Sequence, residues 1–171
     1  MCDKISLKMT KEEFIEKFKA FHSKPEYFAD NIDESWYETF LELGDTIKPI
    51  FEELGRLRRV NPSIPHYPSD TNIFRCFKDC KLTDLKVVIL GQDPYHDGSA
   101  TGLCFDNLKP YKELKSNKKI SPSLQNIQKE LEEDLDFEKY KNVERLEYSI
   151  HNSYLGHLPS QGVLLLNTAL T

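Results

Sequence analysis

The stretch VVILGQDPYHDGSATGLCF, residues 87–105, decides the fold class of this chain. It opens with an uninterrupted aliphatic run and turns polar after Gly91. A continuous β-branched run that ends at a glycine is typical of a strand buried on both faces of a parallel sheet. In open α/β sheets, ligands bind at the carboxyl ends of the strands. We therefore expect the segment QDPYH after Gly91 to border a binding site.

A second aliphatic run, at residues 163–166, predicts a second strand. Between the two runs, Ser121 and Pro122 are residue types that begin helices, and aliphatic residues follow at helical spacing. These aliphatic residues are Leu124, Ile127, Leu131 and Leu135. A strand, a helix and a strand in this order make a parallel βαβ unit. The sequence therefore predicts an α/β fold in which helices flank a parallel sheet.

The residues before this unit are expected to form helices. Thr10 and Ser35 each precede a glutamate by three positions, which is the capping-box pattern that begins a helix. Thr46 is expected to cap a third helix, and the apolar residues at 73–77 predict a short fourth one. The predicted helices therefore precede the first strand.

Composition and charge exclude several classes of protein. The 171 residues are 39% hydrophobic and 30% charged, and the net charge of −5 argues against binding nucleic acid through overall charge. No apolar run approaches the roughly 20 residues of a membrane span, and the N-terminus lacks the apolar core of a signal peptide. We expect an intracellular protein of the nucleus or the cytoplasm.

The four cysteines are too few for a disulfide scaffold in a chain of this size, so reduced thiols are expected. Cys76 and Cys80, taken with His151 and His157, have a spacing that superficially resembles a zinc site. The two pairs stand about 70 residues apart, which favours two reduced thiols on one helix instead.

Four segments occur in an order that resembles the first half of the family 1 uracil-DNA glycosylases. They are GQDPYH at 91–96, ATGLCF at 100–105, PSLQNIQKEL at 122–131 and QGVLLLNTALT at 161–171. The proline-rich segment IPHYPSDTNIFRCF at 64–77 also resembles the region that precedes the first strand in that family. The similarity extends over about residues 35–171 and implies a uracil-DNA glycosylase-like α/β fold.

The resemblance implies a role for each residue of the site. Asp93 corresponds to the catalytic carboxylate, and the main chain of Gln92 and Asp93 is expected to face uracil. Phe105 corresponds to the platform on which the extruded base stacks, and Tyr95 to a wall at the C5 edge that excludes thymine. Asn167 corresponds to the amide that pairs with uracil and mispairs with cytosine. Taken alone, Phe105 would be a core residue and Asn167 a turn residue at a strand end.

The same resemblance assigns supporting roles and partners. His96 is expected to support the loop structurally, and Pro122 and Ser123 to contact the DNA backbone. The implied partner is uracil-containing DNA, single- or double-stranded, bound by a monomer that needs no cofactor, no metal and no membrane. The implied domains are an N-terminal helical extension over 1–34 and the glycosylase-like domain over 35–171.

The chain departs from the family pattern in three respects. Thr101 stands where many relatives carry a histidine, and the lysine-rich residues 109–119 replace a shorter, more apolar connection. The family's second catalytic histidine and its leucine wedge have no counterpart after the second strand, and the sequence ends on the apolar segment GVLLLNTALT. We therefore expect the N-terminal part of a longer protein, with a sheet that is incomplete on its C-terminal side.

Three functions are compatible with these patterns. The resemblance favours a DNA repair glycosylase that hydrolyses the N-glycosidic bond of deoxyuridine, releases uracil and leaves an abasic site. The alternative is a catalytically incomplete DNA-binding or replication-accessory module that retains the glycosylase scaffold. A nucleotide or flavin binder is the weakest candidate, because the sequence lacks the Gly-x-Gly-x-x-Gly fingerprint.

Overall fold

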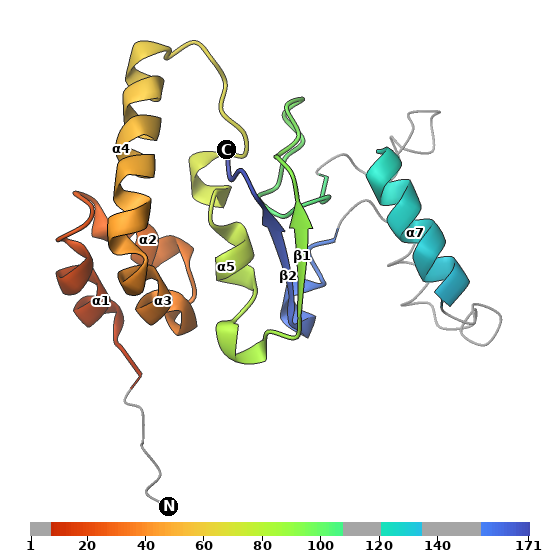
Figure 1. The fold of residues 1–171 in the computed structure, drawn as a ribbon, viewed down its shortest axis with the longest axis horizontal. Helices are drawn as coiled ribbons and strands as arrows, with labels where there is room; N and C mark the ends of the chain where they lie inside the picture. The colour runs from red at the N-terminus through yellow and green to blue at the C-terminus, as the bar shows by residue number, and fades with distance from the viewer. Residues whose placement is uncertain (1–7, 108–120, 135–154) are drawn as a thin grey trace, which may run out of the picture.

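The computed structural model describes residues 8–107, 121–134 and 155–171 (Figure 1). The helices and strands in chain order are α1 (Lys11–Phe18), α2 (Pro25–Asn31), α3 (Tyr37–Glu42), α4 (Gly44–Val60), α5 (Arg75–Asp79), β1 (Val87–Gly91), α7 (Pro122–Asp134) and β2 (Val163–Asn167). Single 3₁₀ turns lie at Glu34–Trp36, Asp70–Asn72, Leu82–Asp84 and Pro159–Gln161.

The two strands confirm the α/β prediction. β1 and β2 pair in parallel, in a register that runs from Val87 opposite Val163 to Gly91 opposite Asn167. Helix α7 comes between the strands in the sequence, as the βαβ pattern predicts. Figure 1 shows α5 and the N-terminal helices on one side of the sheet and α7 on the other. The carboxyl ends of both strands therefore meet at one edge.

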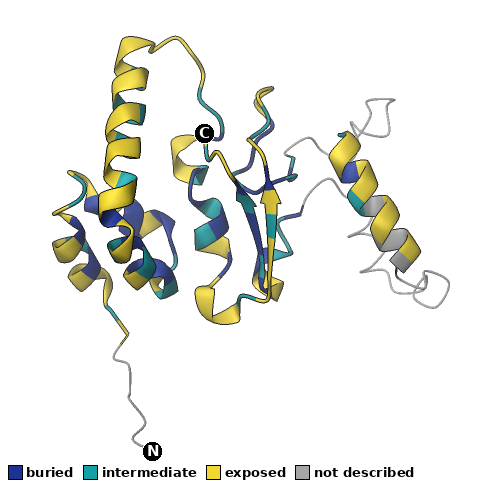
Figure 2. Ribbon diagram, viewed as in Figure 1, coloured by how far each residue is buried: buried dark blue, intermediate teal, exposed yellow. Residues whose placement is uncertain are grey.

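The burial of β1 differs from the prediction. Val87, Val88 and Leu90 are 50%, 48% and 60% exposed, whereas Leu164 and Leu165 of β2 are 4% and 1% exposed (Figure 2). Within the described residues, β1 pairs with β2 along one edge and has no strand along the other. The expectation of a strand buried on both faces is therefore wrong for β1. An aliphatic run shows that a strand is hydrophobic, but it does not show whether another part of the protein covers that strand.

An aromatic core joins the N-terminal helices to the layer beneath the sheet. Phe14 of α1 stacks on Tyr37 of α3, with ring centroids 4.3 Å apart. Phe28 of α2 packs against Phe74, just before α5, with centroids 5.2 Å apart. These side chains belong to the same buried cluster as Leu165 of β2. The domain boundary after residue 34 stays a prediction.

Of the three helix caps predicted before the first strand, one agrees with the structure. Thr10 caps α1 in a complete capping box, as predicted. Ser35 is not a cap: the Asp33 carboxylate accepts from the Ser35 N–H at 3.0 Å and begins the 3₁₀ turn instead. Thr46 lies inside α4, which starts at Gly44, because the Leu43 carbonyl already accepts from the first N–H groups of that helix. The predicted caps at Ser35 and Thr46 are therefore wrong.

Helix α7 is anchored by its first turns. Leu124 is 1% exposed, and Ile127 is half-buried on the same face. The side chain of Leu131, the whole of Leu135 and the lysine-rich residues 109–119 lie outside what the structure describes. None of the described helices is long and apolar enough to cross a membrane.

Candidate active site

Hydrogen bonds lock the loop after β1 to the segment after β2. The Thr168 N–H donates to the Gly91 carbonyl at 3.0 Å, and the Ala169 N–H donates to the Gln92 carbonyl at 3.0 Å. The Thr168 hydroxyl donates to the same Gln92 carbonyl at 2.7 Å. The backbone that carries Gln92 and Asp93 is therefore fixed relative to both strand ends.

Asn167 packs against the end of β1 because residue 91 is a glycine. A Cβ at Gly91 would lie 2.3 Å from the Asn167 Oδ1 atom and 2.7 Å from the Cys104 Cβ atom. Asn167 is 8% exposed, and its amide makes no hydrogen bond with the described residues. A buried amide of this kind can both donate to and accept from a ligand.

Four of the residues singled out from the sequence line one cavity. Asp93, Tyr95, Phe105 and Asn167 border it, and the cavity is small, with a volume of about 10 Å³. A space of this size holds about one water molecule. The structure brings these residues together, and their roles stay predictions.

The main chain beside this cavity has N–H groups without a hydrogen-bond acceptor in the described part of the chain. Gln92 and Asp93 are exposed, and their N–H groups donate to no acceptor within residues 8–107, 121–134 and 155–171. Unpaired N–H groups at a strand end can stabilise negative charge that develops on a bound ligand.

Phe105 reaches the cavity from a constrained loop. It has φ of 62°, in the left-handed region that non-glycine residues rarely adopt. Gly102, in the same loop, has φ of 90°, and a Cβ there would lie 2.0 Å from the Asn72 carbonyl oxygen. The loop therefore presses directly against the segment that leads into α5.

A buried carboxylate that the sequence reasoning missed holds this loop. Asp106 is 0% exposed, and its Oδ1 atom accepts from the Leu155 N–H at 2.5 Å. Its Oδ2 atom lies 3.6 Å from Nη1 of Arg75, which also donates to the Thr101 carbonyl at 3.3 Å. The only sequence signal is a charged residue directly after the apolar segment GLCF, and this also fits an exposed turn.

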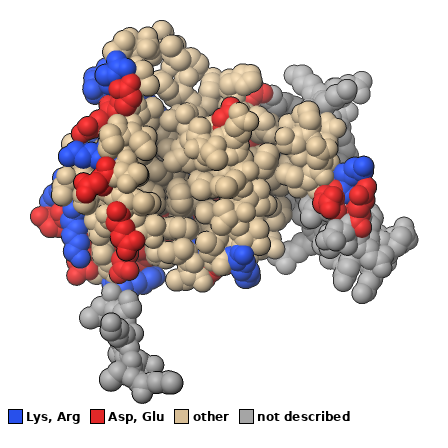
Figure 3. Space-filling model, in the orientation of Figure 1, with Lys and Arg blue, Asp and Glu red and all other residues tan. Residues whose placement is uncertain are grey.

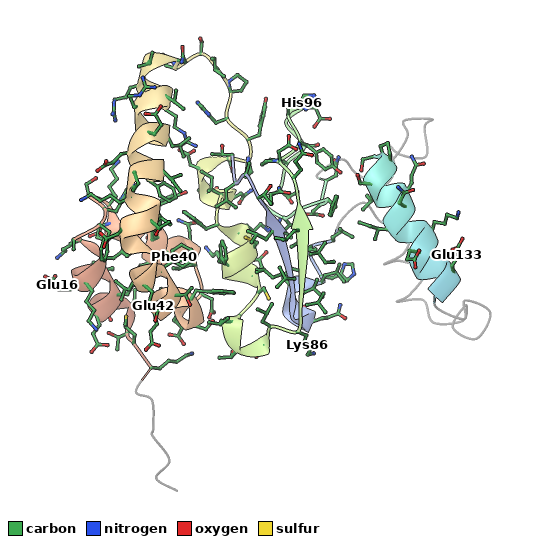
Figure 4. The ribbon with its side chains drawn as sticks, in the orientation of Figure 1. Glu16, Phe40, Glu42, Lys86, His96 and Glu133 are labelled. Atoms are coloured by element: carbon green, nitrogen blue, oxygen red, sulfur yellow. The ribbon has the colours of Figure 1, made fainter. Side chains whose placement is uncertain are left out.

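The remaining predicted residues lie on the surface. His96 is exposed at the strand-end side of the molecule (Figure 4) and has no hydrogen-bond partner among the described residues. Pro122 and Ser123 are exposed in the first turn of α7. On the face drawn in Figure 3, charged side chains gather over the N-terminal helices and α7, and the described residues over the strands are mostly uncharged. The supporting and DNA-contacting roles therefore stay predictions.

The described cysteines are buried free thiols. Burial raises the pKa of Cys76 to about 12 and that of Cys104 to about 11, and it raises the pKa of Cys80 as well. In the described part of the chain, no three His, Cys, Asp or Glu side chains are grouped so that they could hold a metal ion. His151, one of the residues in the zinc-like spacing, lies outside the described residues.

These pKa shifts predict slow alkylation of the native protein. With a pKa of about 12, the thiolate fraction of Cys76 at pH 8 is on the order of 10⁻⁴. Treatment with iodoacetamide at pH 8, followed by peptide mass spectrometry, is expected to leave Cys76, Cys80 and Cys104 unmodified. The same treatment in urea is expected to modify all three. Rapid labelling of Cys76 in the native protein would contradict this burial.

Comparison with known proteins gives one consistent result. The chain is 43% identical over 104 residues to uracil-DNA glycosylase 1 of Listeria monocytogenes, an alignment that covers 60% of this chain and 39% of that protein. It is 38% identical over 143 residues to uracil-DNA glycosylase of Pseudomonas aeruginosa and 37% identical over 143 residues to that of Campylobacter jejuni. Each of these two alignments covers 82% of this chain and 54% of the relative.

The chain thus spans about half the length, or less, of the curated relatives it matches. No family model matches it. The curated relatives agree on one family, and the motifs GQDPYH and LLLN stand at the two strand ends where the cavity forms. The chain belongs to the uracil-DNA glycosylase family.

Proposed function

We propose that this chain carries the uracil-recognising part of a DNA repair glycosylase, which hydrolyses the N-glycosidic bond of deoxyuridine in DNA. The products are free uracil and an abasic site. The observation that carries the proposal is the meeting of Asp93, Tyr95, Phe105 and Asn167 at one cavity beside the paired strand ends. Sequence positions more than 70 residues apart converge there, in a chain whose curated relatives are named uracil-DNA glycosylases.

The chemistry of the bond explains why a carboxylate and N–H donors belong together. Cleavage leaves positive charge on the sugar and negative charge on the departing base. Asp93 supplies a fixed negative charge for the sugar and orients the attacking water. The N–H groups of Gln92 and Asp93 donate to the base as its oxygen becomes more negative. Because the loop is hydrogen-bonded to Thr168 and Ala169, these groups need little rearrangement during the reaction.

Three side chains provide base selectivity in this proposal. Phe105 stacks against the extruded base. Asn167 accepts from uracil N3–H and donates to O4, whereas cytosine presents an acceptor and a donor in the opposite positions. Tyr95 stands at the C5 edge and excludes the thymine methyl group by volume.

The DNA strand is proposed to pass over the start of α7. Pro122 and Ser123 are exposed there, and the free N–H groups of a first helical turn suit a phosphate. His96 supports the loop after β1. The protein acts as a monomer and accepts single-stranded DNA more readily than duplex, since no base pair must be broken to extrude the uracil.

The direct test uses single-stranded oligonucleotides that differ in one base. The full chain is incubated with oligonucleotides that contain one uracil, one thymine or one cytosine, and alkali then cleaves any abasic site. Strand cleavage with the uracil substrate alone is expected. Cleavage of none of the three would reject glycosylase activity for this chain, and binding with a steep salt dependence but no release would favour the non-catalytic DNA-binding module.

A further inference from the structure

A hydrogen bond connects the wall of the base cavity to the start of α7. The Tyr95 hydroxyl and the Ser121 hydroxyl lie 2.7 Å apart, and either group can donate. Tyr95 belongs to the loop after β1, and Ser121 immediately precedes α7. Both side chains are half-buried. From the sequence, Ser121 is expected to begin a helix and to lie in the segment 121–124 that resembles the family's DNA-contacting loop, and no contact with Tyr95 is predicted.

The contact is placed where it can control the position of the tyrosine ring. The hydroxyl oxygen is the heavy atom of Tyr95 furthest from the backbone, so a bond there restricts rotation about χ1, the torsion that would swing the ring away from the cavity. The ring lines the same cavity as Phe105 and Asn167. A wall that cannot rotate rejects an added methyl group strongly, because overpacking a rigid site is costly. A wall that can rotate yields, and the added group is accommodated.

The other end of this bond is itself held in place. The Ser121 carbonyl accepts from the Gln125 N–H at 3.0 Å, in the first turn of the helix. Leu124, three residues after Ser121, is 1% exposed and anchors that turn in the core. The serine hydroxyl therefore projects from a fixed helix start and not from a freely moving loop.

We infer that Ser121 is a specificity-determining residue, which acts through Tyr95 to reject pyrimidines with a substituent at C5. Ser121 touches no base and is a positioning residue, and the inference rests on the proposed function. Removal of its hydroxyl lowers the selectivity for uracil without abolishing uracil release.

The test compares three single-stranded oligonucleotides that contain uracil, 5-fluorouracil or thymine at the same position. For Ser121→Ala in the full chain, the ratio of kcat/KM for uracil to kcat/KM for thymine is expected to fall about 3- to 10-fold, the effect of one neutral hydrogen bond. The ratio of kcat/KM for uracil to kcat/KM for 5-fluorouracil is expected to fall less, because fluorine is smaller than a methyl group. Tyr95→Phe removes the same bond from the other side and is expected to have the same effect.

The double variant and a neighbouring serine serve as controls. Ser121→Ala combined with Tyr95→Phe is expected to be no worse than either single change, because both remove one shared contact. Ser123→Ala, two residues away and exposed, is expected to weaken binding of all three oligonucleotides equally and to leave the ratios unchanged.

The possible failures can be told apart. Selective uracil release by the wild-type chain, with unchanged ratios in Ser121→Ala, would overturn this inference and leave the proposed function intact. Equal loss of selectivity in Ser123→Ala would also overturn it, since a general loosening of the helix start would then be the cause. No uracil release by the wild-type chain would overturn the proposed function and this inference with it.

Discussion

Asp93→Asn is expected to slow uracil release by about 10²- to 10⁴-fold and to leave DNA affinity nearly unchanged. The substitution keeps the shape of the side chain and removes its negative charge. In the proposed reaction, that charge stabilises a sugar that becomes positive only as the bond breaks, so its loss raises the barrier more than it weakens binding. The loop backbone is held by Thr168 and Ala169 and is expected to keep its position in the variant.

The measurement is a single-turnover time course with excess protein over a uracil-containing oligonucleotide. Asp97→Asn provides a matched control in the same loop, because Asp97 accepts from the Ser99 N–H at 3.1 Å and does not line the cavity. It is expected to change the rate less than about threefold, since an asparagine oxygen can accept the same bond. A rate for Asp93→Asn within threefold of wild type would remove Asp93 from the catalytic role.

Asp106→Ala is expected to lower the free energy of unfolding by about 2–3 kcal/mol. The substitution leaves the buried Leu155 N–H without its acceptor and takes one of two carboxylates from Arg75, which keeps Asp79 at 2.9 Å. For a protein of this size the loss corresponds to a fall in Tm of roughly 5–10 °C. The loop that carries Phe105 is expected to loosen as well, because Asp106 is the next residue along the chain.

Thermal unfolding followed by circular dichroism measures this effect. Asp106→Asn keeps an oxygen for the Leu155 N–H and loses only the charge near Arg75, so its effect is expected to be smaller. Asp84→Ala removes an exposed carboxylate and is expected to change the stability by less than about 0.5 kcal/mol. Equal Tm values for Asp106→Ala and wild type would mean that the buried carboxylate contributes nothing to stability.

The sequence was most informative where one short segment determines the structure by itself. The capping box at Thr10 and both strands follow from local patterns, their parallel pairing follows from the strand–helix–strand order, and the structure confirms all three. The exposure of β1 was not predictable, because an aliphatic run has the same appearance whether or not another element covers it. The cap at Asp33 was missed because Ser35, with Glu38 three residues later, fits the capping-box pattern and Asp33 does not.

The site shows the same division between local and distant information. The resemblance named the cavity residues because each lies in a short recognisable motif. The contacts of Asp106 with Leu155 and of Tyr95 with Ser121 join residues 49 and 26 positions apart, and no local pattern predicts which residues pair. Contacts of this kind depend on how the loops pack in three dimensions, and a short sequence pattern does not contain that information.

The close approach of Gly91 and Asn167 ties the assembly of the sheet to the base recognition proposed for Asn167. These two residues are register partners, and the amide has room only because its partner has no side chain. If the strands paired one position out of step, Leu90 or Gln92 would stand opposite Asn167, and every side chain of the shifted strand would also point to the wrong face. If Asn167 recognises the base as proposed, a molecule with a shifted register could not place the amide beside the base. Base selectivity would then also report whether the two strands have paired in the correct register.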